Sequence, residues 1–149
     1  MIDLTRRLFV RAALITGALT VGCSASRASW PGSAFAAHGL HAALNELLGS
    51  SDFEPSHRIR LSAPETAENG GIVPVTVTTD LEGVESISLI ATRNPRPLTS
   101  SYIIPPGTLG YVSTRIKMQE TADIIAIVKA ADRYYGNRKR VVVAVGGCT

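Results

Sequence analysis

The sequence contains little cysteine: Cys23 and Cys148 are the only two among 149 residues. Cys23 lies in an N-terminal segment with the features of an export leader, and removal of that leader would leave Cys148 as the only thiol. A single thiol cannot form a disulfide within its own chain, which excludes a fold held together by intramolecular disulfides. In an oxidising compartment such a thiol is expected either to be reactive or to pair with another chain.

The sequence also lacks the motifs of hydrolytic, phosphate-binding and metal centres. Its histidines, His38, His41 and His57, all precede the main predicted strands, and none lies in a zinc-ligand or nucleophile-elbow motif. His38 and His41 could share a metal only with a third ligand at suitable spacing, and the sequence offers none. These absences argue against a catalytic centre and predict neither a cofactor nor a metal.

An excess of basic charge is missing from the part of the chain that is expected to fold. The sequence has 15 Lys and Arg against 12 Asp and Glu. Four of the basic residues and one acidic residue precede Ala37, so 15 − 4 and 12 − 1 leave equal numbers of basic and acidic residues after it. The basic character therefore belongs to the leader and does not argue for nucleic-acid binding.

Residues 1–36 have the features of a twin-arginine signal peptide. The motif Thr5-Arg6-Arg7-Leu8-Phe9-Val10 is followed by an apolar run over residues 12–21 that is too short and too glycine-broken to span a membrane. The pattern predicts export of a folded protein to the periplasm. Cleavage is expected after Ala34-Phe35-Ala36; the competing interpretation is lipid attachment at Cys23, although the residue three positions earlier is Thr20 rather than leucine.

The rest of the chain predicts one short helix and then a series of strands. Residues 37–52 carry leucines at helical spacing and a stop at Gly49. Residues 53–145 show about seven short strands with turn signals between them, which predicts an all-β fold, an antiparallel β-sandwich of the immunoglobulin type. The predicted strands are 59–61, 72–79, 85–92, 102–104, 112–118, 123–130, and a final pair, 133–135 and 140–145, separated by a turn at Gly136-Asn137.

The last four residues predict a flexible arm, 146–149, that presents a thiol. Gly146 and Gly147 lack a Cβ and adopt φ > 0 readily, so they form a loose tether in front of Cys148. A thiolate is the nucleophile to which sulfur adducts attach, and exposure favours that chemistry. The alternative interpretation is a frayed tail whose cysteine is incidental.

Four basic residues lie on the segment that leads to Cys148. Positive charge near a thiol lowers its pKa and attracts anions, so these residues are candidates for drawing a sulfur oxyanion towards the arm. The competing interpretation is an ordinary polar hairpin. The residues are Arg133, Arg138, Lys139 and Arg140.

Six stretches of the chain form an ordered set: residues 63–70, 73–75, 83–87, 94–95, 111–118 and the Gly-Gly-Cys of 146–148. Taken in order, they resemble the SoxY family, the carrier subunit of periplasmic thiosulfate oxidation. The resemblance implies an immunoglobulin-like protein that works as a heterodimer with SoxZ. It implies that thiosulfate is joined oxidatively to Cys148 by the haem protein SoxAX, that SoxB hydrolyses the terminal sulfone, and that SoxCD oxidises the remaining sulfane where present.

The end of the chain departs from the family pattern, which usually reads Gly-Gly-Cys-Gly-Gly. Thr149 stands where the first following glycine is expected, and its β-branched side chain restricts the backbone beside the thiol. Two hypotheses follow: covalent carriage of sulfur on Cys148, or an exported binding module whose altered tail no longer carries sulfur.

Overall fold

The computed structural model describes residues 30–144, and the chain divides into two compact units, residues 1–30 and 31–149. The fold described below belongs to the second unit. The twin-arginine motif, Cys23 and the predicted arm with Gly146, Gly147 and Cys148 lie outside the described residues.

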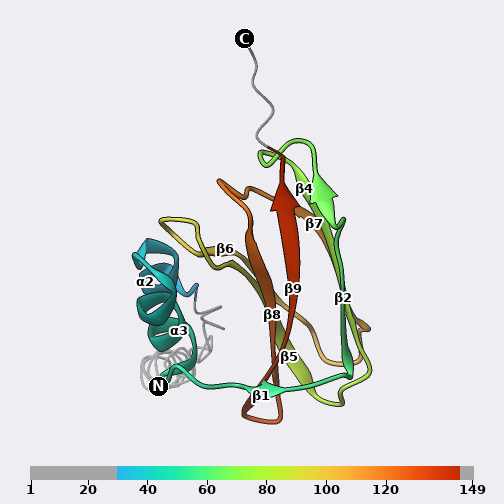
Figure 1. The fold of residues 1–149 in the computed structure, drawn as a ribbon. Coiled ribbons are helices and arrows are strands. Elements are labelled where there is room, and N and C mark those ends of the chain that lie inside the picture. Colours follow the sequence, from blue (N-terminus) through green and yellow to red (C-terminus); the bar gives the residue numbers. More distant parts are fainter. Residues whose placement is uncertain (1–29, 145–149) are drawn as a thin grey trace, which may run out of the picture. The chain divides into compact units, whose positions relative to one another are not determined.

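Within the described residues, two short helices precede the strands (Figure 1). Helix α3, Leu40–Leu48, lies within the segment predicted to be helical, and it ends at Gly49, whose left-handed φ of 73° lets its N–H reach Asn45 O at 2.9 Å. Helix α2, Gly32–Ala36, was not predicted because its residues form the small-residue end of the leader. Its Ala34 is fully buried, so the expected cleavage boundary after Ala36 falls at the end of a packed helix.

The strands form two sheets, as expected for an immunoglobulin-like sandwich. The larger sheet has the order β1-β9-β8-β5-β6, with β3 also pairing with β9. Its strands are β1 Glu54–Pro55, β3 Thr66–Ala67, β5 Val84–Ala91, β6 Leu98–Ile103, β8 Ala122–Ala130 and β9 Arg133–Val143. The smaller sheet has the order β2-β4-β7, with β2 Ile59–Ser62, β4 Val73–Thr79 and β7 Gly110–Ile116.

The larger sheet is covered on both faces (Figure 1). One face packs on the smaller sheet through a core that includes Val75, Val77, Leu89 and Val128, all almost completely buried. The other face packs on α2 and α3 through a second core that includes Ile90, Ile125 and Ile127. Burial from both sides explains why residues 124–128, in the middle of β8, are all apolar, as the sequence predicted for a central strand.

The chain does not turn at Gly136-Asn137, and this prediction was wrong. Residues 133–143 form one strand, and residues 133–141 of it pair with β8 without interruption. The hairpin turns instead at Ala131 and Asp132, which both adopt positive φ, at 48° and 59°, as a tight two-residue hairpin requires. The antiparallel pattern also has exceptions, because the two-residue strands β1 and β3 run parallel to β9.

Candidate functional site

Strand β9 is held from both sides up to its last described residues. On one side, Val142 N–H donates to Glu65 O and Ala144 N–H donates to Ala67 O, each at 2.9 Å. On the other side, Val143 N–H donates to the Thr121 hydroxyl at 3.0 Å. The sandwich therefore positions the backbone of Ala144, and Cys148 follows four residues later in the sequence.

A groove of about 710 Å³ opens beside these residues, and we call it the terminal groove. Two loops form it together with the end of β9: the turn at Gly70 and Gly71, and the segment from Lys117 to Thr121. The loops are tied together where Met118 N–H donates to Gly70 O at 2.7 Å. A Cβ at residue 70 would overlap Met118 O and lie 2.8 Å from Val143 Cγ1, so this close approach requires glycine.

The sequence did not predict the terminal groove. Gly70-Gly71 is a local turn signal, but no linear pattern shows that this turn lies beside Lys117 and Val143. The one sequence feature that the two loops share is the family resemblance, because the family-like stretches 63–70 and 111–118 each end within one of them.

The four basic candidates lie along β9 but do not form one cluster. Arg133, at the start of the strand, pairs with Glu54 at 2.9 Å and lies 5.7 Å from the ring centroid of Tyr135. Lys139 Nζ donates to a main-chain oxygen, Ala63 O, at 2.6 Å. Only two of the four, Arg138 and Arg140, are both exposed and close to the end of β9.

Arg140 makes only a long ion pair with Asp123. Its guanidinium lies 3.5 Å from Asp123 Oδ1, and its side chain remains 67% exposed. Arg138 and Arg140 are two residues apart in a strand, so they project from the same face of the sheet. These two residues make the end of β9 locally basic, and their role in attracting anions remains a prediction.

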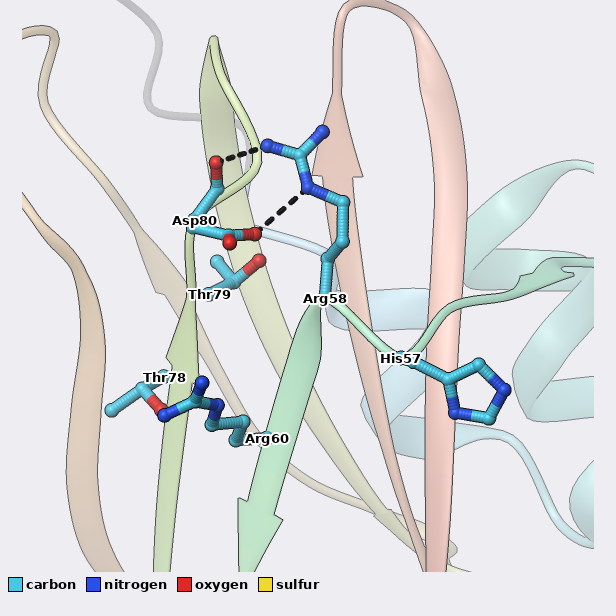
Figure 2. Close-up of a pocket in the computed structure, with 6 residues that line it drawn as sticks. All are labelled: His57, Arg58, Arg60, Thr78, Thr79 and Asp80. Carbon is cyan, nitrogen blue, oxygen red and sulfur yellow. Dashed lines mark hydrogen bonds and ion pairs between the residues drawn. The ribbon is translucent and has the colours of Figure 1, made fainter.

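A second hollow, of about 410 Å³, lies at the opposite end of the smaller sheet (Figure 2). Figure 2 shows Arg58 turned towards Asp80, with both its Nε and a terminal nitrogen bonded to that residue. The hydrogen bond from Arg58 lowers the pKa of Asp80, and the two side chains form an exposed ion pair. His57 points away from the pair, and Arg60 lies beside Thr78.

This hollow does not join the terminal groove. It is lined by Thr78 and Thr79 at the end of β4, whereas the groove lies next to the start of that strand. A strand of this length separates the two regions by about 20 Å.

Within residues 30–144, no three His, Cys, Asp or Glu side chains come together to hold a metal ion. The helices of residues 30–144 also lack the length and apolar character that a membrane-spanning helix needs.

A comparison with curated proteins found no match. Comparisons with solved structures and with a family model agree with this architecture. Among solved structures, the chain is similar to the sulfur carrier protein SoxY from Chlorobium limicola f thiosulfatophilum. The two are 34% identical with a TM-score of 0.62, over 69% of this chain and 94% of the other.

Two structures of superoxide reductase (neelaredoxin) from Ignicoccus hospitalis share the fold alone. They are 19% and 17% identical to this chain, with TM-scores of 0.52 and 0.51, over 59% of this chain and 81% of theirs. The model of the family described as sulfur oxidation protein SoxY matches residues 44–148, from helix α3 through the C-terminal cysteine. Match, identity and coverage together show that the chain belongs to the SoxY family of sulfur oxidation proteins.

Proposed function

We propose that this chain is a sulfur carrier that holds thiosulfate-derived intermediates covalently on Cys148. The observation that carries the proposal is the extent of the family match, which continues past the sandwich to residue 148 and so includes the cysteine. The sandwich supports the role by fixing Ala144 at the end of β9, so that Cys148 is tethered to a stable body. Four extended residues span about 14 Å, far enough for the sulfur to leave the surface of that body.

The chemistry requires partner enzymes. Loading joins the Cys148 sulfur to the sulfane sulfur of thiosulfate: the thiol loses its proton, a sulfur–sulfur bond forms, and two electrons leave to a haem protein of the SoxAX type. Hydrolysis by a SoxB-type enzyme then cleaves the sulfur–sulfonate bond with water, which releases sulfate and two protons and leaves a persulfide anion on Cys148. The chain itself turns nothing over, and a SoxCD-type enzyme would oxidise the persulfide sulfur.

The heterodimer partner and the compartment belong to the same proposal. A SoxZ-like subunit is the expected partner, and the leader places the pair in the periplasm by twin-arginine export. Mass spectrometry of the exported protein tests the processing step. A chain that begins at Ala37 is expected, and a diacylated N-terminal Cys23 would contradict that choice.

Intact-protein mass spectrometry tests the carrier role. The purified chain is incubated with thiosulfate, a SoxAX-type haem protein and an electron acceptor, with Cys148→Ser and Cys23→Ser variants in parallel. The proposal predicts a thiosulfate adduct on the unaltered chain and on the Cys23→Ser variant, and no adduct on Cys148→Ser. If the unaltered chain also stays unmodified while it still binds its partner subunit, the carrier role is wrong and the chain is a binding module.

A further inference from the structure

Helix α2 belongs to the folded body and not to the segment that precedes it. The division of the chain into compact units falls between Trp30 and Pro31, so α2 lies in the same unit as the sandwich. The helix packs on α3 and on β6 (Figure 1). Its Ala34 is fully buried in the second core, which also contains Leu98 of β6. The predicted leader, residues 1–36, therefore ends inside the folded body.

Hydrogen bonds and packing hold both sides of the expected cleavage site, the bond between Ala36 and Ala37. Before it, Phe35 N–H donates to Pro31 O at 3.1 Å within α2, and the Phe35 side chain packs against the second core. After it, Gly39 N–H donates to Pro95 O at 3.2 Å, which joins the linker between the helices to the loop between β5 and β6. The site is thus part of the packed structure.

Cleavage after Ala36 requires a different conformation of these residues. A peptidase that reads an A-x-A motif must receive the small side chains of Ala34 and Ala36 in its own binding site. Ala36 is exposed, but the Ala34 side chain is buried in the second core. Proteolysis also needs backbone that is exposed and not hydrogen-bonded into the fold, whereas Gly32–Ala36 is helical. Docked α2 and a bound peptidase therefore exclude each other.

The order of events in export brings this conflict into play. The twin-arginine pattern predicts export of a protein that has already folded, so α2 is docked before the chain meets the peptidase. This step rests on the leader and the cleavage site proposed above. It does not depend on sulfur carriage.

We propose that α2 is an intramolecular block on processing, and that the peptidase acts only on chains whose α2 has left α3 and β6. Water hydrolyses the peptide bond, so that Ala36 gains a carboxyl group and Ala37 an amino group. Local opening is fast relative to cleavage, so the rate of processing follows the population of undocked α2. Hydrolysis makes undocking permanent, because Ala34 and Phe35 are then no longer tethered to the body.

Cleavage of the purified full-length precursor by a type I signal peptidase in detergent tests the block, with intact-protein mass as the readout. Phe35→Ala is the informative variant. Residue 35 is the variable position of the A-x-A motif, so recognition is kept while packing against the second core is lost. This variant is expected to yield the chain 37–149 about tenfold faster, because it raises the undocked population by about that factor.

Three controls separate local undocking from other causes. Ser33→Ala changes an exposed position of the same helix and should alter the rate by less than about twofold. Val112→Ala weakens the other core, between the two sheets, and should leave the rate nearly unchanged because α2 stays docked. A peptide of residues 20–42 has no sandwich to dock on, so it should be cut equally fast with phenylalanine or alanine at residue 35.

The possible failures are distinguishable. The block is overturned if the precursor is cut as fast as the peptide, if Phe35→Ala does not speed its cleavage, or if Val112→Ala speeds it equally. If neither the peptide nor the precursor is cut after Ala36, the proposed cleavage site is wrong and the block on it is wrong as well. The adduct on Cys148 is measured separately, so none of these outcomes bears on the carrier role.

Discussion

The ring of Phe53 packs against the bare Cα of Gly136 in the middle of β9. A Cβ at residue 136 would overlap Phe53 Cδ2 and lie 3.2 Å from Ile127 Cδ1. The glycine is present because a side chain approaches the backbone closely, and not because the chain turns. This contact anchors the segment between helix α3 and β1 to the same strand that leads to Cys148.

Gly136→Ala is therefore expected to destabilise the fold by about 1–3 kcal/mol, the usual cost of forcing extra volume into a packed site. Chemical denaturation of the variant measures this. Arg138→Ala, two positions along the same face and exposed, is the control and should change the free energy of unfolding by less than about 0.5 kcal/mol. An unchanged unfolding midpoint for Gly136→Ala would show that Phe53 moves away without cost.

An ion pair joins the neighbouring strands β5 and β8, with Lys129 Nζ 2.6 Å from Glu85 Oε2. The hydrogen bond from Lys129 lowers the pKa of Glu85 below its ordinary 4.5, and the same bond raises the pKa of Lys129 above 10.5. The Glu85 contribution to stability is therefore complete above pH 4.5 and is lost as the pH falls through the lowered value. The Lys129 contribution is complete below pH 10.5 and is lost as the pH rises through the raised value.

Glu85→Gln should accordingly lower the melting temperature at neutral pH, and the difference from the unaltered protein should shrink in acid as Glu85 becomes protonated. Both side chains are partly exposed, so the effect at neutral pH is expected to be small. Glu82→Gln removes one charge from the preceding turn and serves as the control. A difference that stays constant from neutral pH into acid would contradict the electrostatic explanation.

The exposed pair Arg138 and Arg140 is expected to speed sulfur loading by attracting anions to the end of β9. Replacing both with alanine should slow loading a few-fold at low ionic strength, and the effect should vanish in 1 M salt, where the Debye length is about 3 Å. Samples that are quenched at successive times and analysed by mass spectrometry give the rate of sulfur loading on Cys148.

Arg133→Ala combined with Arg58→Ala removes the same total charge at the other end of the sandwich and should leave the rate almost unchanged. If this control slows loading as much, the effect depends on net charge and not on position. If neither double variant slows loading at low salt, β9 does not attract the substrate.

Patterns within a strand predicted most of the sheet. Alternation in residues 72–79 and 112–118 and the apolar run in 123–130 predicted β4, β7 and β8, because these strands bury one or both faces along their length; the structure ends β7 at Ile116. The two-residue strands β1 and β3 carry no periodicity, and they exist because β9 offers them an edge. Their pairing depends on residues far away in the sequence.

The candidate site likewise has one part that the sequence identifies and one part that it does not. Cys148 could be selected from the sequence, since a lone thiol behind two glycines is a local feature. The terminal groove could not, because Gly70, Lys117 and Val143 meet only in the folded chain. Arg133 illustrates the converse: it is close in sequence to Arg138 but lies at the start of β9, where Glu54 pairs with it.

The most direct test of the carrier role uses protein isolated from cells that are oxidising thiosulfate. Trypsin cleaves after Arg140 and releases the peptide 141–149, which contains Cys148 as its only thiol. The account predicts that tandem mass spectrometry, without reducing agent, finds this peptide with thiosulfonate or persulfide sulfur on Cys148. Finding only the unmodified peptide throughout thiosulfate turnover would contradict it.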